Sequence, residues 1–440
     1  MSKLIVFEQQ NAQAAAIDIG SRQIFVSWNG STAHSYSTFT EGYKQCIVDL
    51  KTNGVKRVCM EATGVYWIPL YQMLEASGME VCLVNPKEVK QVKGRKTDVK
   101  DCCWMQKVFS AGLVRQSYIP SGKLKELRML VREREDIISM GGTYVNKMQK
   151  ALELMNIKLT EVLSQINGVS GLRVIEAVIN GERDKEKLLA LCHQSIKDKK
   201  AEQVLKALEG NYNDTYIFLL AQNLKLYNTH QQQLLIIDQQ IQVILEIIQE
   251  GKNEVPPQHK IKPIRHHKPI IENLHQKLLN IYGVDANCLP GITDYTLLKL
   301  LGEAGADLSR FPTAKHFVSW CQLAPSHNQS GMRSKKSTVR NGSKSGQIFR
   351  EIAQGLINSK YITIGAFIRR IRGRKDSKIA IKAGARKLAI AFYNLLTKGT
   401  AYVEKGIKQY DELLKEKERK LLNKLAIKHG MKLIDYQQSI

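Results

Sequence analysis

Two long stretches of the chain repeat apolar residues at alternating spacings of three and four positions. This spacing places the apolar side chains along one side of a helix, as in an a/d seam. The first stretch comprises Val145, Met148, Leu152, Met155, Leu159, Val162 and Ile166. The second comprises Leu220, Leu224, Tyr227, Gln231, Leu234, Ile237, Ile241, Ile244 and Ile248, with Gln231 as its one polar member. We expect a long helical coiled-coil region over residues 121–250, whose helices pair either within one chain or between two chains.

The residues before this region follow a different pattern. Residues 14–28 indicate two short strands, and Asn29-Gly30 is a strong signal for a hairpin leading to a third strand near 33–39. Helical and strand patterns then alternate up to a helix near 97–111. The predicted order is β-β-β-α-β-α-β-α, which favours a mixed sheet flanked by helices, an α/β fold, over residues 1–120.

After the seams, the chain becomes rich in proline and charge, and residues 251–280 are predicted to be a linker. Pro290-Gly291, followed by a helical pattern, fits a helix-hairpin-helix whose helix N-terminal amides can hold a phosphate. An ordinary turn between two helices fits it equally well. Residues 376–430 again show helical patterns, so residues 281–440 are expected to form a mostly α C-terminal domain.

The basic residues of the chain are concentrated in one segment. Lys and Arg number 66 against 41 acidic residues, a net charge of +25. Between Arg333 and Lys387 there are 16 Lys or Arg and two acids, Glu351 and Asp376. Neutralising phosphates releases counterions, so such a block is typical of a protein that binds nucleic acid. A solvated basic surface is the alternative.

Other features narrow the class of protein. No run of 18 apolar residues predicts a membrane span, and MSKLIVFEQQ lacks the apolar core of a signal peptide, so we expect a cytoplasmic protein. The eight cysteines form no C-x-x-C pair and are expected to be reduced, small apolar residues. The histidines of the linker, His259, His266 and His267, do not have the spacing of a metal site.

Four acidic residues stand out against this basic background. Asp18 interrupts an apolar strand, AIDIG, and Glu61 ends the next long apolar strand, VCMEATG. Asp98 and Asp101 are three residues apart, so on a helix they share one side. Each alone has an ordinary explanation: a turn residue, a partner for Arg57, or a solvated ion-pair face. If all four converge, their mutual repulsion is relieved by a pair of Mg²⁺ ions, which prefer oxygen ligands and can clamp a phosphodiester.

Five segments carry a resemblance to a known family: AIDIGSRQIFVSW, MEATGVYW, VNPKEVKQVKGRKTDVKD, PGITDYTLLKLLGEAGADLSRF and QLAPSHNQSG. They resemble the DEDD-type insertion-sequence transposases, recombinases whose studied members are guided by a bridge RNA. The resemblance implies a RuvC-like (RNase H-like) N-terminal domain and a C-terminal transposase domain that carries a serine. It also implies DNA, both donor and target, and a noncoding guide RNA as partners, and a homo-oligomer, a dimer or a tetramer, with no membrane association.

The resemblance also assigns roles to individual residues. Asp18, Glu61, Asp98 and Asp101 match the family's metal-binding tetrad, which implies two Mg²⁺ ions as cofactor. Ser330, one of several serines in its loop, matches the nucleophile that forms a phosphoserine linkage to DNA. The surrounding basic residues would then hold the DNA backbone. They are Arg333, Lys335, Lys336, Arg340, Lys344 and Arg350.

Two other functions compete with a transposase. One is a RuvC-like junction endonuclease, which cuts with metal-activated water and forms no covalent intermediate. The other is a non-enzymatic nucleic-acid-binding protein built on a former nuclease fold. The presence of all four acids disfavours the second of these.

Overall fold

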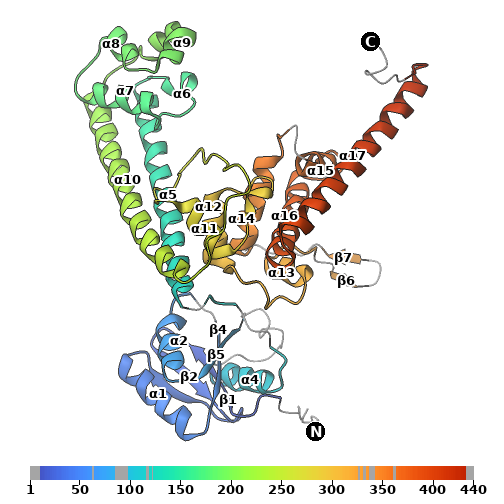
Figure 1. Ribbon diagram of the computed structural model, residues 1–440. Coiled ribbons are helices and arrows are strands. Elements are labelled where there is room, and N and C mark those ends of the chain that lie inside the picture. The colour runs from blue at the N-terminus through green and yellow to red at the C-terminus, as the bar shows by residue number, and fades with distance from the viewer. Residues whose placement is uncertain are drawn as a thin grey trace. The chain divides into compact units, whose positions relative to one another are not determined.

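The computed structural model in Figure 1 describes residues 10–61, 64–84, 98–114, 118–120, 122–325, 328–330, 333–335, 342–359 and 363–432. The chain forms two compact units, residues 1–119 and 120–440. The finer division into four domains, at residues 120, 250 and 280, stays a prediction.

The first unit contains a five-stranded mixed sheet with the strand order β3-β2-β1-β4-β5. Its strands are β1 (Ala14–Ile19), β2 (Gln23–Ser27), β3 (His34–Ser37), β4 (Arg57–Glu61) and β5 (Glu80–Val84). Strands β1 to β3 pair antiparallel, whereas β1, β4 and β5 pair parallel. Its helices are α1 (Thr40–Thr52), α2 (Trp67–Ala76) and α4 (Asp98–Ser110). The predicted α/β order and the Asn29-Gly30 hairpin are confirmed.

Helices cover both faces of this sheet because the strands are apolar on both faces. On one face, Ile17 of β1 and Met60 of β4 pack with residues of α1 and α2. On the other face, Ala16 of β1 and Cys59 of β4 pack with residues of α4. Successive side chains of a strand point to opposite faces. The two hydrophobic cores therefore identify the face toward which each strand residue points.

The second unit is built around two long helices, α5 (Lys123–Leu154) and α10 (Asp214–Gln249). These helices pack side by side (Figure 1). A cap of short helices lies where α5 ends and α10 begins. The cap comprises α6 (Leu159–Val162), α7 (Val169–Ile179), α8 (Lys185–Ala190) and α9 (Gln194–Ala207). The two helices thus pair within one chain, which the sequence left open.

The structure confirms the second predicted seam as one helix and corrects the first. The residues of the second seam lie on α10, and seven of its nine members are buried. The first seam was wrong as a single helix, because α5 ends at Leu154 and Asn156 adopts a positive φ of 57°. Leu159 and Val162 lie on α6 instead. They remain apolar because they fill the core of the cap together with Met148 and Leu152 of α5.

A buried ion pair joins α5 to α10. Arg134 Nε donates to Asp238 Oδ1 at 2.6 Å, and both side chains are 2% exposed. The second carboxylate oxygen of Asp238 accepts the amide of Ile270, and the guanidinium of Arg134 also donates to the carbonyl of His267 and lies 4.8 Å from the ring of Tyr295. Burial alone would lower the pKa of Arg134, but Asp238 and Tyr295 together outweigh burial and the pKa is raised.

The remaining elements pack against the base of the two long helices. They are α11 (Leu274–Tyr282), the 3₁₀ helix η1 (Ala286–Cys288), α12 (Asp294–Ala304), α13 (Ala314–Trp320), β6 (Asn328–Ser330), β7 (Arg333–Lys335), α14 (Lys344–Leu356), α15 (Thr363–Arg372), α16 (Ser377–Lys398) and α17 (Thr400–Lys428). One hydrophobic core joins Phe317, Phe349 and Phe392 to Leu127 and Ile241 of the long helices. The prediction of helices over 376–430 is confirmed.

Two expectations from composition can be compared with the structure. All eight cysteines are free and seven are buried, which confirms that they act as small apolar residues. Within the described part of the chain, none of the helices combines the length and apolarity that crossing a bilayer requires.

Candidate active site

The first predicted acids lie beside each other on the sheet. Strands β1 and β4 are parallel, with Ala16 opposite Cys59 and Ile17 opposite Met60. Continuing this register by one residue places Asp18 beside Glu61. Both share the alternation of Ala16 and Cys59, so they point to the face that α4 covers. Both residues are half-buried.

Helix α4 runs along β1 with a register that its polar side chains fix. Gln106 donates to the carbonyl of Ala14 at 3.0 Å, and the thiol of Cys102 donates to the carbonyl of Ala16 at 3.3 Å. The four residues from Gln106 back to Cys102, about one helical turn, therefore correspond to the two residues from Ala14 forward to Ala16 on β1. The next turn toward the N-terminus, which contains Asp98 and Asp101, comes to the level of Asp18.

The thiol of Cys102 gives an electrostatic sign of this proximity. Burial raises its pKa to about 12; a hydrogen bond with the backbone of Asp18 opposes this rise, whereas the negative charge of Asp18 adds to it. Cys102 is thus a neutral, buried group at physiological pH and no candidate nucleophile. Its place one residue after Asp101 in α4 brings the first turn of that helix close to Asp18.

The structure describes the side chains of three of the four predicted metal-binding acids. Asp18, Glu61 and Asp101 are described, and Asp101 is half-buried. The side chain of Asp98 lies outside the described ones, although its backbone begins α4. Among the side chains that the structure describes, no three His, Cys, Asp or Glu residues gather into a group that could hold a metal ion.

The serine motif forms a hairpin rather than the loop that the sequence suggested. Ser330 ends β6 and pairs with Arg333, the first residue of β7, while Lys335 pairs with Asn328. The side chains of Ser330, Arg333 and Lys335 lie outside the described ones, as do Lys336 and Arg340 altogether. Polar strands this short lack an apolar alternation, which is why sequence patterns missed them.

The last two predicted contact residues lie on α14. Lys344 is its first residue and is exposed, whereas Arg350 is half-buried. Ser343 caps this helix: its hydroxyl accepts the amide of Gly346 at 3.0 Å and donates to the carbonyl of Cys321 at 2.8 Å. The cap therefore fixes α14, and with it Lys344, to the end of α13.

Further basic residues on α15, on α16 and in the turn between these helices were counted in the charge block but not assigned to a site. Those whose side chains are exposed are Arg370, Arg372, Arg374, Lys375 and Lys378. Arg369 is different, because it donates to the carbonyls of Ile357 and Ser359 and so closes the end of α14. The alternation of apolar residues and arginines in TIGAFIRRIR was the signal that could have identified this basic surface.

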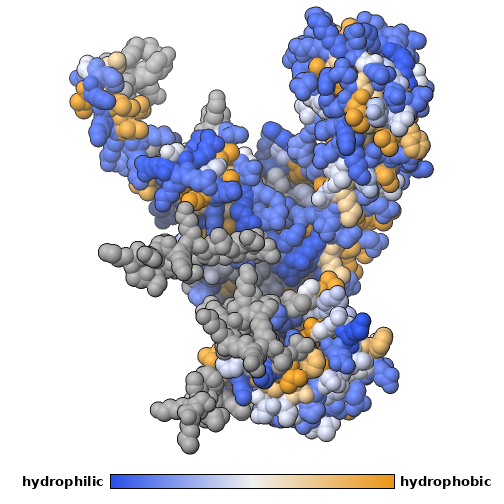
Figure 2. Space-filling view, turned by 180° about the vertical axis from the view of Figure 1, so that it is seen from behind, coloured by the Kyte–Doolittle hydropathy of each residue, from blue (hydrophilic) through white to orange (hydrophobic). Residues whose placement is uncertain are grey.

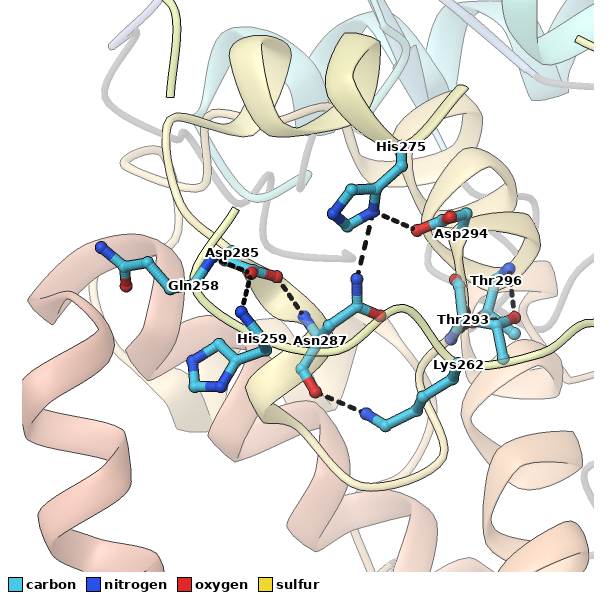
Figure 3. A network of polar contacts seen from close by, with 9 residues as sticks. All are labelled: Gln258, His259, Lys262, His275, Asp285, Asn287, Thr293, Asp294 and Thr296. Carbon is cyan, nitrogen blue, oxygen red and sulfur yellow. Dashed lines mark hydrogen bonds and ion pairs between the residues drawn. The ribbon is translucent and has the colours of Figure 1, made fainter. Parts of the chain in front are cut away.

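The segment around Pro290-Gly291 is a polar network between α11 and α12 (Figure 3). Lys262 donates to the carbonyls of Asn287 and Leu289, and Asp285 accepts the amides of Gln258 and His259. Burial lowers the pKa of Lys262. The segment 258–262 therefore binds the connection between α11 and α12 through hydrogen bonds.

Of the two interpretations of the Pro290-Gly291 segment, phosphate binding at the start of α12 stays a prediction. Thr293 and Thr296 form a capping box in which the amide of each residue donates to the hydroxyl of the other, at 2.7 and 3.4 Å. These two amides are thus already satisfied within the helix terminus. The geometry fits a turn between two helices that its own side chains close.

Gly291 is required at this turn for two reasons. Its φ of +72° favours glycine, and a Cβ there would lie 2.9 Å from a methyl carbon of Ile352 on α14. We expect Gly291→Ala to lower the free energy of unfolding by roughly 2–4 kcal/mol, measured by urea denaturation.

Gly355 provides the matched control for this substitution. It lies on α14, and apart from its own stretch of helix no atom is within 4 Å of a Cβ built there. Gly355→Ala should therefore leave stability unchanged or raise it by about 0.5–1 kcal/mol. Equal unfolding midpoints for the two variants would contradict the packing argument.

Comparison with known families covers the segments that carry the predicted acids and the predicted serine. Residues 15–157, which contain Asp18, Glu61, Asp98 and Asp101, match a family of DEDD-type proteins described as transposase. Residues 287–360, which contain Ser330 and the predicted contact residues, match a family described as transposase IS116/IS110/IS902. No curated protein matches the chain. Both matches lead to one conclusion: the chain belongs to the IS110-type DEDD transposases of insertion sequences.

Proposed function

We propose that this transposase cuts and rejoins DNA with Mg²⁺ held by Asp18, Glu61, Asp98 and Asp101 and with Ser330 as nucleophile. The observation that carries the proposal is the placement of Asp18 and Glu61. They lie side by side at the ends of two parallel strands, on the face where the first turn of α4 continues toward Asp18. Three antiparallel and two parallel strands between helices agree with a RuvC-like domain.

The residues of this face fit a magnesium site. A carboxylate at the end of an apolar strand, next to a second carboxylate, is costly unless a cation compensates the charge. Carboxylate oxygens are the ligands that Mg²⁺ prefers. Asp18 and Glu61 would hold the ions from the sheet, and Asp98 and Asp101 from α4. When bound, Mg²⁺ supplies electrostatic stabilisation of the phosphate oxygens.

The proposed covalent step exchanges one phosphodiester for another. The hydroxyl oxygen of Ser330 attacks the phosphorus and loses its proton to a base. The bond from phosphorus to a sugar oxygen breaks, and that oxygen gains a proton. The product is a serine phosphodiester and a free sugar hydroxyl. Because the number of phosphodiester bonds is unchanged, attack by another sugar hydroxyl can reseal the strand without an external energy source.

The basic surfaces supply the contacts to nucleic acid in this proposal. Lys344 on α14 and the exposed arginines Arg370 and Arg372 of α15 can neutralise backbone phosphates. Arg333, Lys335, Lys336, Arg340 and Arg350 would act at the cleavage point. Guidance by a noncoding RNA is proposed from the family resemblance.

Trapping a protein–DNA adduct tests the proposal. The full chain, with Mg²⁺ and RNA transcribed from the DNA flanking its gene, is mixed with labelled DNA of the element ends. We expect a labelled covalent adduct that maps to Ser330 and is abolished in Ser330→Ala. Ser334→Ala is the matched control, since Ser334 lies in the same hairpin opposite Gln329.

Two outcomes would contradict the serine mechanism. One is full strand exchange by Ser330→Ala. The other is cleavage by Ser330→Ala with no adduct from the wild-type protein, which would identify a junction endonuclease that uses water. Loss of the adduct in Ser330→Ala alone, with the Ser334→Ala adduct intact, supports a nucleophilic serine.

A further inference from the structure

Buried polar side chains of the first unit gather in one place. Hydrophilic residues make up most of the molecular face drawn in Figure 2, where they meet water. Among the described residues of the first unit, Ser27, Gln106 and Ser110 are exceptions, because each is at most 5% exposed. All three lie where α4 meets the hairpin between β2 and β3. A buried polar group is costly unless it is hydrogen-bonded, so this cluster requires an explanation.

The side-chain amide of Gln106 joins α4 to two strands. Its Nε2 donates to the carbonyl of Ala14 on β1 at 3.0 Å and to the carbonyl of Trp28, which follows β2, at 3.3 Å. An amide nitrogen carries two hydrogens, so it can make both bonds. The hairpin turn packs directly on this amide, because a Cβ added to Gly30 would lie 2.6 Å from Gln106 Oε1.

The apolar contacts between α4 and the sheet do not fix the position of the helix by themselves. The sheet side chains in this core are mostly small, and β1 contributes only alanines to it, Ala14 and Ala16. A helix interlocks with its neighbour through large side chains that fill grooves, and such side chains are missing from this part of β1. The thiol of Cys102 also lies within hydrogen-bonding distance of strand carbonyls, but a thiol is a weak donor. The amide of Gln106 is therefore the strongest determinant of the register.

The acidic turn of α4 depends on this register. Val99 and Lys100 are exposed, and burial of the helix begins only at Cys102. The positions of Asp98 and Asp101 thus follow from the anchored part of the helix. A shift of α4 by one residue would displace them by about 1.5 Å along the helix axis. Mg²⁺ requires oxygen ligands at about 2.1 Å in a near-ideal octahedron and does not tolerate a displacement of this size.

We propose that Gln106 is a positioning residue for the metal site. Its amide holds α4 in one register on β1, and that register brings Asp98 and Asp101 to the level of Asp18. The inference rests on the magnesium site proposed above. Gln106 contacts neither metal nor DNA in this arrangement and acts through α4. Its loss should therefore weaken metal binding and slow cleavage, although every metal ligand is still present.

Gln106→Met in the full-length protein tests this role. Methionine is an unbranched side chain of similar length but has no N–H donor. Mn²⁺ takes the same oxygen ligands as Mg²⁺, and the electron paramagnetic resonance signal of the free ion measures its binding without DNA. The Kd for Mn²⁺ should rise at least about tenfold, as expected when a group that orients metal ligands is lost. Single-turnover cleavage at saturating Mg²⁺ should also fall at least about tenfold.

Two substitutions on the same helix are matched controls. Phe109→Leu reduces packing in the same core, where Phe109 is 6% exposed, and should lower the melting temperature while Mn²⁺ affinity stays within about twofold. Ser110→Ala removes a buried hydroxyl that donates to the carbonyl of Gln106 within α4, and it should change neither readout. If Gln106→Met does not fold, Gln106→Ala carries the same expectation, because alanine favours the helix.

Asp18→Asn, measured in the same assays, separates this inference from the proposed function. Wild-type Mn²⁺ affinity and cleavage in folded Gln106→Met, when Asp18→Asn has lost Mn²⁺ binding, would overturn the positioning role and leave the metal site standing. Unchanged Mn²⁺ binding by Asp18→Asn would contradict the metal site and with it the role of Gln106. Equal weakening by Phe109→Leu and Gln106→Met would also overturn the proposal, because any loss of core packing would then suffice.

Discussion

Asp18→Asn is expected to abolish DNA cleavage while leaving the fold intact. The substitution keeps the shape of the side chain but removes the negative charge at the end of β1, beside Glu61. Metal-ion stabilisation of a phosphoryl transfer is worth several kcal/mol, and about 1.4 kcal/mol is tenfold in rate. Cleavage of the element ends should therefore fall at least about 100-fold, measured with labelled DNA under single-turnover conditions.

A second readout separates metal binding from activity. An ion that binds the folded protein raises its melting temperature. Titration with Mg²⁺ should stabilise the wild type and leave Asp18→Asn unchanged. Glu80→Gln is the control: it removes a charge from the same sheet, at an exposed pair with Arg57, and should keep the magnesium response. Cleavage and magnesium stabilisation that persist in Asp18→Asn would contradict a metal site at this residue.

Asp238→Ala is expected to destabilise the second unit strongly. It leaves the guanidinium of Arg134 buried without its carboxylate, and it removes the acceptor of the Ile270 amide. Breaking a buried ion pair from one side costs about 3–5 kcal/mol. Urea denaturation should show this loss, and hydrogen exchange should show faster opening in residues 123–154 and 214–249.

Two further variants separate the ion pair from general effects of substitution. Arg134→Leu with Asp238→Leu removes both charges and should be more stable than Asp238→Ala alone, because no unpaired charge remains. Glu202→Ala breaks a fully exposed pair with Lys206 and should have little effect. If Asp238→Ala behaves like Glu202→Ala, the buried pair does not stabilise the contact between α5 and α10.

The sequence predicted those parts of the fold that local patterns determine. The order of strands and helices in residues 14–110 follows from alternation and turn residues, and α10 follows from its buried seam. The face on which Asp18 and Glu61 lie could not be deduced, because it depends on which helices cover each side of the sheet. That information appears only when Ala16 and Cys59 are seen to pack against α4.

Other features depend on contacts between residues far apart in the sequence. Arg134 and Asp238 are 104 positions apart, and the sequence around each residue does not indicate that the other is its partner. An acid adjoining the apolar seam of α10 was nevertheless a signal, since a charge there requires a partner. The end of α5 was missed because Asn156 takes a left-handed conformation that interrupts the apolar spacing without changing it.

The segment 251–273 has no helix or strand, yet its backbone and side chains are held at intervals by the rest of the second unit. The backbone amides of Val255, Gln258 and Ile270 each donate a hydrogen bond to a side chain outside this segment. Lys262 donates to the carbonyl of Asn287 in the connection before α12. Irregular surface segments are the usual places to insert a reporter or to shorten a protein. In this transposase an insertion or deletion in the segment 251–273 would break the hydrogen bonds that join it to α10 and to the connection before α12. Fusion partners should therefore be inserted elsewhere in the chain.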